Sequence, residues 1–196
     1  MITLSIMGVS VLIAVAVAIP VGILVAFSDR LEAVVRPILD MMQVLPPFVY
    51  LIPALIFFGV SGTQSVFLTV VYSIPPAIRL TNLGIRQVPR ENIETALSHG
   101  STTLQTLVQV QLPLARRSIM MGVNQTIMMA MAMVIITALV GAGGLGRDVW
   151  TALRQIDSGK GLESGVAIVL LTIILDRLSY ALARDDVKAT SPNTTT

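Results

Sequence analysis

The chain has 196 residues, of which 54% are hydrophobic and only 12% are charged, with a mean hydropathy of +0.83. A soluble domain carries about 25% charged residues, so this composition excludes an ordinary soluble protein and predicts a one-domain, all-α membrane helix bundle. The net charge of +2 gives no reason to expect a nucleic-acid partner, and the absence of Cys from the sequence excludes disulfides and thiolate metal sites. The single His, His99, cannot build a metal site by itself, so we expect none.

The apolar residues fall into about five runs that approach the length needed to cross a bilayer, which is about 20 residues of helix. The first run holds no charged residue between Met1 and Phe27. A cleaved signal peptide is the competing interpretation. This run lacks a basic start and is longer than the apolar core of such peptides, so we expect a retained span. The predicted spans are residues 4–27, 41–60, 65–83, 119–140 and 164–183.

The charged residues indicate how the loops are arranged. We expect 29–40 to be a charged linker and 185–196 to be a disordered cytoplasmic tail. With these spans, one set of loops carries most of the Arg and Lys residues, and the other set carries only Arg147, Arg154 and Lys160. An excess of basic residues marks the cytoplasmic side. We therefore expect the N-terminus outside, the C-terminus inside, and the polar segment 84–117 in the cytoplasm.

The segment 84–117 is the longest polar interruption between apolar runs, and its pattern predicts a hairpin of two short helices joined at Gly100. Gly100 permits the left-handed turn that ends a helix, and Thr102 with Gln105 matches the capping box that opens one. We expect the second helix to end at Pro113. A loop of this kind cannot lie in lipid, because its backbone groups would lose their hydrogen-bond partners, so it protrudes into water.

The first helix of this hairpin has a polar start and an apolar side. Glu91 and Glu94 lie near its N-terminus, where the helix macrodipole favours negative charge. Apolar residues at helical spacing predict a ridge that a partner can bind, formed by Ile93, Ala96, Leu97 and Leu104.

Prolines interrupt the second and third spans, at Pro46–Pro47 and at Pro75–Pro76. Broken helices free backbone groups that can line a cavity, although plain bending for packing explains these prolines equally well. The side chains beside the breaks that could bind a passing solute are Tyr50, Tyr72 and Ser73.

Three polar residues lie early in the fourth span: Asn124, Gln125 and Thr126. Polar side chains in a membrane face the bundle, because lipid offers them no partner. They are candidates for the solute path, while hydrogen bonding between helices is the slightly favoured alternative.

The segment 141–146 formally matches the GxGxxG pattern of dinucleotide-binding proteins. It follows a membrane helix rather than a strand and lies on the expected external side, so cofactor binding is disfavoured. A simple turn at the interface is the first interpretation. A functional version makes a hinge or outer gate from Gly141, Gly143, Gly144 and Gly146.

The sequence contains no GxxxxGK[ST] loop, so we expect no bound ATP, no cofactor, no catalytic residue and no enzymatic activity in this chain. Any energy from ATP would then come through a partner, and the segment 84–117 is the evident docking element. Because about five spans form at most half a channel, we also expect a homodimer.

The segment 84–117 also resembles a known element, the EAA loop in the permease subunits of bacterial ABC importers. That resemblance rests on Glu94-Thr95-Ala96, Gly100, Val110 and Leu112-Pro113 at the same spacings. The pattern of the family is Glu-Ala-Ala, Gly and then Ile-x-Leu-Pro, so Thr95 and Val110 depart from it. The stretches MQVLPPFVYLIPALIFFGV and GAGGLG are similar to the glycine betaine/proline class of that family.

The resemblance implies a type I ABC importer permease core over residues 1–184, in the bacterial plasma membrane. It implies import of glycine betaine, proline and related compatible solutes, an ATPase subunit pair that hydrolyses ATP, and an external solute-binding protein. The hairpin's first helix would insert into a groove on the ATPase. The residues that the resemblance assigns to ATPase coupling are Glu91, Glu94, Thr95, Ala96, Gly100, Leu112 and Pro113.

Two alternatives remain open. One is a permease of the same kind for another small solute, such as an amino acid. The other is a secondary transporter, which usually carries an internal repeat, and we find no clear repeat.

Overall fold

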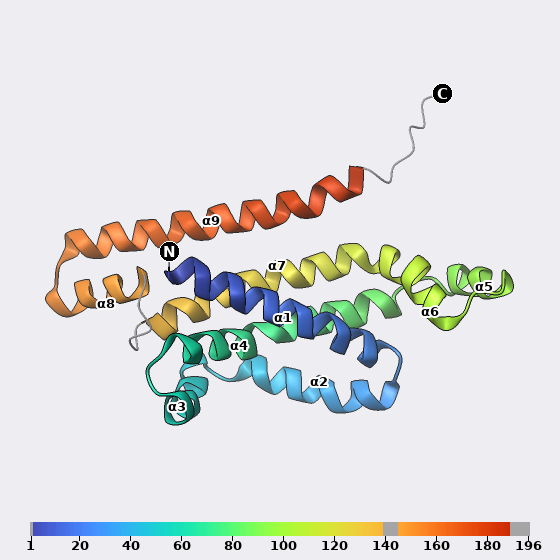
Figure 1. The fold of residues 1–196 in the computed structure, drawn as a ribbon, viewed down its shortest axis with the longest axis horizontal. Coiled ribbons are helices and arrows are strands. Elements are labelled where there is room, and N and C mark those ends of the chain that lie inside the picture. The colour runs from blue at the N-terminus through green and yellow to red at the C-terminus, as the bar shows by residue number, and fades with distance from the viewer. Residues whose placement is uncertain (1, 139–144, 189–196) are drawn as a thin grey trace.

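The computed structural model describes residues 2–138 and 145–188, with side chains described through Ile174 and at Arg177 (Figure 1). All secondary structure in these residues is helical, as composition predicts. The helices are α1 (Ile2–Ala26), α2 (Asp29–Val44), α3 (Pro47–Phe58), α4 (Gly62–Arg86), α5 (Arg90–Ser98), α6 (Thr103–Thr106), the π-helical η1 (Leu107–Gln111), α7 (Leu112–Thr137), α8 (Leu145–Gln155) and α9 (Ser158–Lys188).

Three long helices, α1, α4 and α7, form the core of the bundle, and α9 runs along its side (Figure 1). Glycines let the core helices approach closely. A Cβ atom added at Gly22 of α1 would lie 2.6 Å from Cβ of Thr81 in α4. A Cβ added at Gly122 of α7 would lie 3.1 Å from Cα of Ala77, also in α4. The middle helix α4 is therefore held between its neighbours at distances that larger residues would not permit.

The expected spans are largely present. Among the described residues, three helical stretches are long and apolar enough to cross a membrane: Ile2–Ala26, Gly62–Arg86 and Thr103–Thr137. They overlap the first, third and fourth predicted spans, and that they cross a membrane stays a prediction. The fifth predicted run, 164–183, lies within α9.

The break that the sequence predicts at Pro46–Pro47 in the second span, 41–60, is present, whereas the break predicted at Pro75–Pro76 in the third span is wrong, because α4 runs through both prolines. α2 and α3 meet at an angle of 97°, and the pair would count as a fourth span only as one broken element. The cause is the Pro46–Pro47 pair, because a residue before proline is pushed out of the helical region. Leu45, which precedes Pro46, is extended with ψ 130°.

The residues expected to form a linker, 29–40, are helical and belong to α2. Ser28 caps this helix, since its Oγ accepts a hydrogen bond from the backbone N–H of Leu31 at 3.3 Å. Asp29 and Glu32 then lie in the first turn, where the macrodipole favours acidic residues.

At the C-terminus, α9 continues to Lys188, so the first four residues of the tail expected to be disordered, 185–188, are helical instead. Residues 189–196 lie outside the described part of the chain.

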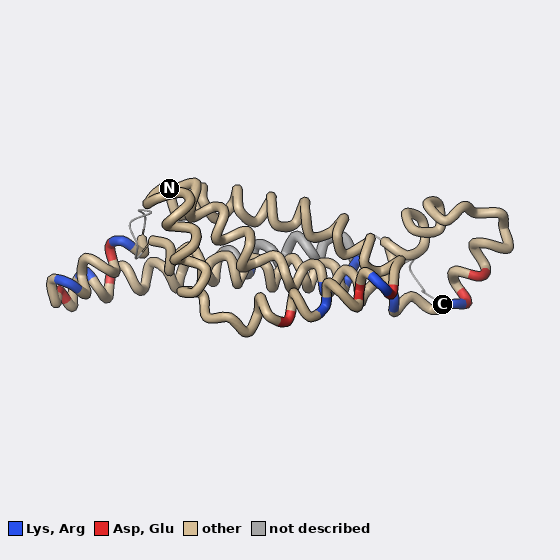
Figure 2. The backbone as a smooth tube through the Cα atoms, turned by 90° about the horizontal axis from the view of Figure 1, so that it is seen from below, with Lys and Arg blue, Asp and Glu red and all other residues tan. Residues whose placement is uncertain are grey.

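The connections alternate between the two ends of the bundle in the order that the charge pattern predicts (Figures 1 and 2). The N-terminus, the start of α4 and α8 lie at one end. The α1–α2 turn, the α5–α6 hairpin and the C-terminal end of α9 lie at the other. That the hairpin end is cytoplasmic stays a prediction from the basic residues.

The close approach of α1 and α4 can be tested at two glycines of the same helix. Gly22→Ala would place its new methyl group against Thr81 and 2.9 Å from the carbonyl oxygen of Ile78, whereas Gly8→Ala meets nothing within 4 Å. We expect Gly22→Ala to lower the free energy of unfolding by about 1–3 kcal/mol, and Gly8→Ala to be neutral or slightly stabilising. Thermal unfolding in detergent measures both. Equal melting temperatures for the two variants would contradict the described α1–α4 packing.

Candidate functional site

The first helix of the hairpin, α5, ends in the turn that the sequence predicts at Gly100. Gly100 has φ +82°, in the left-handed region. Its N–H donates to the carbonyl of Leu97 at 2.9 Å, and the N–H of Ser101 donates to the carbonyl of Ala96 at 3.2 Å. These two bonds form the Schellman motif, in which a glycine satisfies the last carbonyls of a helix and reverses the chain. The polypeptide therefore leaves α5 in a fixed direction.

The predicted capping box opens the second helix of the hairpin. Thr102 Oγ1 accepts from the backbone N–H of Gln105 at 3.3 Å, and the side-chain oxygen of Gln105 accepts from the N–H of Thr102 at 2.8 Å. Both hydrogen bonds join residues three positions apart, so the spacing of Thr102 and Gln105 in the sequence is enough to predict this capping box.

The expectation that this helix ends at Pro113 is wrong. α6, the π-helical turn η1 and α7 form one unbroken helical stretch, Thr103–Thr137. Pro113 has no N–H and its ring would crowd the carbonyl of Gln109 in a regular α-helix. The wider π turn lies immediately before it, with the N–H of Leu112 bound to the carbonyl of Leu107, and lets the helix continue past the proline.

The hairpin protrudes from the bundle and exposes most of its side chains (Figure 1). α5 contains no buried residue, and Glu91, Glu94 and Thr95 are exposed. The ridge predicted from apolar spacing is in part accessible: Leu97 is 51% exposed and Leu104 is 69% exposed, while Ile93 and Ala96 are half-buried. Exposed leucines on a protruding element offer an apolar surface to a partner.

The departure from the family pattern at Thr95 has a simple structural consequence. Thr95 Oγ1 donates to the carbonyl of Glu91 at 2.7 Å, one turn earlier in the same helix. His99 Nδ1 lies 2.8 Å from the carbonyl oxygen of Thr95. Both polar groups are satisfied within the hairpin, so neither needs a partner protein to complete its hydrogen bonds.

The base of the hairpin packs into the bundle. Leu107, Ile85 and Ala115 are buried in one apolar cluster, and Leu112 packs against it. This cluster joins η1, the end of α4 and the start of α7, so the hairpin is not a loose appendage. Pro113 itself is exposed.

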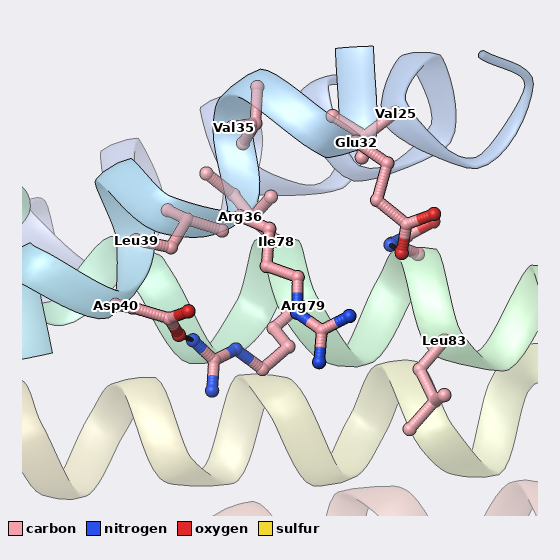
Figure 3. A pocket seen from close by; sticks show the side chains of 10 residues that line it. Val25, Glu32, Val35, Arg36, Leu39, Asp40, Ile78, Arg79 and Leu83 are labelled. Atoms are coloured by element: carbon pink, nitrogen blue, oxygen red, sulfur yellow. Dashed lines mark hydrogen bonds and ion pairs between the residues drawn. The ribbon is translucent and has the colours of Figure 1, made fainter. Parts of the chain in front are cut away.

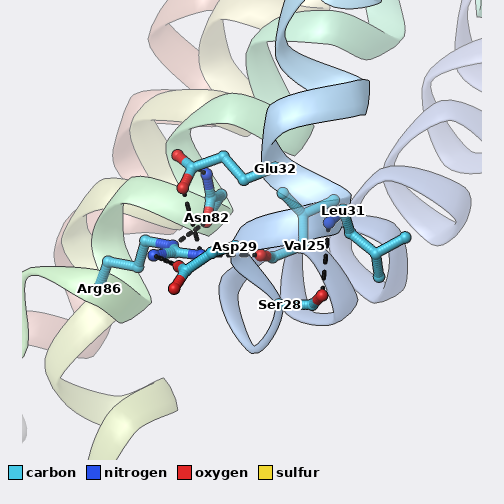
Figure 4. Close-up of polar contacts among 7 residues, drawn as sticks. All are labelled: Val25, Ser28, Asp29, Leu31, Glu32, Asn82 and Arg86. Carbon is cyan, nitrogen blue, oxygen red and sulfur yellow. Dashed lines mark hydrogen bonds and ion pairs between the residues drawn. The ribbon is translucent and has the colours of Figure 1, made fainter.

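A dense polar node centred on Arg86 lies at the end of α4, directly before the hairpin (Figure 4). The Arg86 guanidinium contacts Asp29 Oδ1 at 2.7 Å, Glu32 Oε2 at 3.2 Å and the carbonyl of Val25 at 3.2 Å. Its Nε donates to Asn82 Oδ1 at 3.0 Å, and Asn82 Nδ2 donates to Glu32 Oε1 at 3.0 Å. One side chain thus joins the ends of α1, α2 and α4.

Two of the three candidate path residues on α3 and α4, Tyr50 and Tyr72, contact each other. Tyr50 and Tyr72 pack edge to face, with ring centroids 6.0 Å apart. The Tyr50 hydroxyl donates to the carbonyl of Met42 at 2.6 Å and so bridges the break between α2 and α3. Ser73 is fully buried, and its hydroxyl donates to the carbonyl of Thr69 at 2.6 Å within α4.

The three candidate path residues of α7 point to different sides of the helix, because successive helical residues are about 100° apart. Gln125 is exposed, Asn124 is half-buried, and Thr126 is fully buried. The side-chain oxygens of Asn124 and Thr126 have no hydrogen-bond partner among the described residues. Within this chain the three do not form one polar surface.

Of the candidate gate glycines, only Gly146 lies in the described residues; Gly141, Gly143 and Gly144 lie outside them. A Cβ added at Gly146 would lie 2.5 Å from Cβ of Ala138 and 2.9 Å from the carbonyl oxygen of Ile135. Gly146 therefore lets the start of α8 pack against the end of α7, and its role in a hinge or outer gate stays a prediction.

Sequence reasoning missed the polar residues of α2 and their partners on α4. It treated Asp29, Glu32 and Asp40 as parts of a linker. A signal was present, because Asp29, Glu32, Arg36 and Asp40 recur at spacings of three and four residues, which is the helical period.

Comparison with known proteins shows that the chain is similar to components of transport systems. A family model described as "Binding-protein-dependent transport system inner membrane component" matches residues 18–185. The chain is 47% identical over 90% of its length to the glycine betaine transport system permease protein OpuAB of Bacillus subtilis. It is 48% identical over 91% of its length to the glycine betaine/carnitine transport permease protein GbuB of Listeria monocytogenes. It spans 63% and 64% of the lengths of these two relatives.

The fold also has a solved counterpart. A structure described as an inward-facing conformation of the MetNI methionine ABC transporter matches with a TM-score of 0.81 at 20% identity. The match covers 97% of this chain and 94% of that one. At this identity the likeness concerns the fold alone.

The Arg86 node yields a stability prediction. Arg86→Ala leaves Glu32 and Asn82 without their shared partner, so we expect it to lower the free energy of unfolding by about 1–3 kcal/mol. Arg86→Lys keeps the charge but loses the planar guanidinium group, and we expect it to lower the free energy of unfolding by less than Arg86→Ala does. Arg90→Ala is the matched control, because the exposed side chain of Arg90 has no hydrogen bond or ion pair within the described part of the chain. Thermal unfolding in detergent separates them; an Arg86→Ala variant as stable as Arg90→Ala would refute the node's role.

Proposed function

The chain belongs to the family of binding-protein-dependent transport system inner membrane components, and from this premise we propose that it is the permease subunit of an ATP-driven importer for glycine betaine and related compatible solutes. The observation that carries the proposal is its 47–48% identity, over nine-tenths of its length, to two proteins named as glycine betaine permeases. Because the chain spans less than two thirds of each relative, the activity of the whole protein is inferred and not observed.

Energy enters this importer through the hairpin. The sequence contains no phosphate-binding loop of the GxxxxGK[ST] kind, so a pair of ATPase subunits binds and hydrolyses ATP. The hairpin is the docking element, with α5 inserted into a groove on the ATPase and Leu97 and Leu104 supplying apolar contact. The protrusion of the hairpin and the exposure of these two leucines support this assignment.

The residues assigned to coupling divide into two groups by position. Glu91, Glu94, Thr95 and Ala96 lie on α5, where they can meet the ATPase, and Gly100 fixes the turn that orients α5. Leu112 and Pro113 lie where the hairpin becomes α7. A push on the hairpin is transmitted to the membrane through this helix, because no break separates Thr103 from Thr137. Rocking of helix bundles about a central path is the resulting motion.

The solute path forms between two copies of the permease. One copy leaves a stripe of α7 uncovered, on which Met121, Gln125 and Met128 are exposed. Gln125, together with Tyr50 and Tyr72 near the helix break, offers hydrogen bonds to a solute, while Ser73, Asn124 and Thr126 lie within the bundle and act only indirectly. The candidate outer gate comprises Gly141, Gly143 and Gly144 together with Gly146, which lies at the start of α8.

An external solute-binding protein selects the solute. Quaternary ammonium groups are typically recognised by cages of aromatic rings. Only 5% of the residues in this chain are aromatic, so the cage belongs to the binding protein. Import of another small solute, such as an amino acid, is the second candidate, and the match to the family of binding-protein-dependent transport components favours it over a secondary transporter.

Uptake by the reconstituted importer tests the proposal. The full permease, its ATPase and its binding protein are placed in proteoliposomes, and entry of labelled glycine betaine is followed. We expect uptake that requires ATP and is competed by carnitine and proline betaine but not by methionine, because the amino acid lacks the quaternary ammonium group. Uptake of labelled methionine with no uptake of glycine betaine would establish the amino-acid alternative. Uptake without the ATPase would refute ATP-driven import altogether.

A further inference from the structure

Helix α2 packs on the bundle through Val35, Leu39 and Met42, and it exposes both an apolar side and a charged edge that borders α4. The exposed side carries residues that are 46–61% exposed at helical spacing: Leu31, Val34, Ile38 and Met41. The opposite side carries Asp29, Glu32, Arg36 and Asp40 and faces α4 (Figures 3 and 4). An exposed apolar face suits lipid, and the charged residues lie on the other side of the helix, beside α4. Ionisable residues that a membrane protein keeps away from lipid mark water-filled paths and binding sites more often than packing contacts.

A cavity of about 290 Å³ lies between α2 and α4 on this polar side (Figure 3). Its size is near the lower limit for sites that bind small molecules, about 300–1,000 Å³. The walls combine charged groups with apolar surface: Glu32, Arg36, Asp40 and Arg79 with Leu39 and Ile78. Arg79 lies seven residues before Arg86, about 10 Å deeper along α4 than the base of the hairpin.

The charges in the cavity are balanced in sign but not fully paired. The Asp40 carboxylate forms an ion pair with the Arg79 guanidinium, and both side chains remain about half exposed. Glu32 is held by Arg86 and Asn82. The Arg36 guanidinium lines the cavity and has no ion partner among the described residues. Two acidic and two basic side chains leave no net charge, so the cavity suits a neutral molecule with separated charges better than a net ion.

We propose that this cavity binds the zwitterionic solute during its passage through the half of the permease nearer the hairpin. This inference rests on the proposed function, since that function supplies a solute with a carboxylate and a quaternary ammonium group. The Arg36 guanidinium binds the carboxylate in the two-pronged geometry that arginine favours. The ammonium group lies beside Asp40, and its methyl groups contact Leu39 and Ile78. The site holds the solute weakly, as a transport path requires.

The absence of native cysteine allows a direct occupancy test. Leu83→Cys places a reporter thiol in the cavity wall, at a side chain that is 43% exposed. Arg30→Cys places a control thiol on an exposed position of α2 that does not line the cavity. Each variant is assembled into the complete importer in phosphatidylcholine nanodiscs, and the rate of labelling of the permease by a thiol reagent is measured with and without glycine betaine.

We expect glycine betaine to slow labelling of the Leu83→Cys variant several-fold and to leave the Arg30→Cys variant unchanged. Adding Arg36→Gln to the Leu83→Cys variant should remove the protection, because the carboxylate loses a charge-assisted partner worth about tenfold in affinity. Tetramethylammonium carries only the quaternary ammonium group of glycine betaine, and acetate carries only its carboxylate. Each should therefore protect the thiol less than glycine betaine does.

Transport kinetics give a second readout in the same complex. Arg36→Gln should lower the kcat of import about tenfold while KM, which the binding protein sets, stays within about twofold. The matched control Arg30→Gln should import as the unmodified protein does.

The outcomes separate this inference from the proposed function. If the unmodified importer takes up glycine betaine but the solute gives no protection at Leu83→Cys, the cavity is not a solute site and the proposed function stands. Protection by phosphatidylglycerol without solute would assign the cavity to a lipid headgroup and overturn the inference. Failure of the unmodified importer to take up glycine betaine would overturn both.

Discussion

Continuity of one helix is the constraint on which the rest of the arrangement depends. The stretch Thr103–Thr137 begins in the exposed hairpin and ends deep in the bundle, with no break at Pro113. A proline inside an α-helix usually costs about 3 kcal/mol, and the π turn at Leu107–Gln111 reduces that conflict by widening the helix before the ring. The hairpin can therefore act as a lever, because a helix that bends at Pro113 would absorb a displacement instead of passing it to the membrane.

The hairpin can act as a lever only if the bundle at its base is held together, and two features of α4 do this. Glycines hold α4 at close range between α1 and α7, and Arg86 joins the end of α4 to the ends of α1 and α2. The hairpin leaves the bundle at this node, between α4 and η1. The polar face of α2 extends from the node along α4 to the Asp40–Arg79 pair, so one row of charges connects the base of the hairpin to the cavity. The base of the hairpin and the cavity thus both border the contact between α2 and α4.

Local chemistry could be predicted from the sequence, while contacts between distant segments could not. The left-handed turn at Gly100 and the capping box at Thr102 each depend on neighbouring residues, and both are present. The contacts of the charged stretch 29–40 could not be predicted, because its partners, Arg79, Asn82 and Arg86, lie 39–57 residues away in sequence. Pro113 was expected to end a helix because propensity alone cannot foresee a π turn. Ser73 is a candidate for the solute path only because its side chain is polar. In the structure it is buried, and its hydroxyl donates to the carbonyl of Thr69 within α4.

Coupling efficiency in the complete importer tests the central claim, that an unbroken helix carries motion from the hairpin to the membrane. Val108 and Gln109 are exposed in the π turn. Replacing both by Gly or both by Ala removes the same side chains, but the Gly pair loosens the helix by about 1 kcal/mol per residue. The amount of solute imported per ATP hydrolysed is measured for each pair. The account predicts that both variants retain the ATPase, and that import per ATP falls several-fold in the Gly pair and stays near the original value in the Ala pair. Equal import per ATP in the two variants would contradict it.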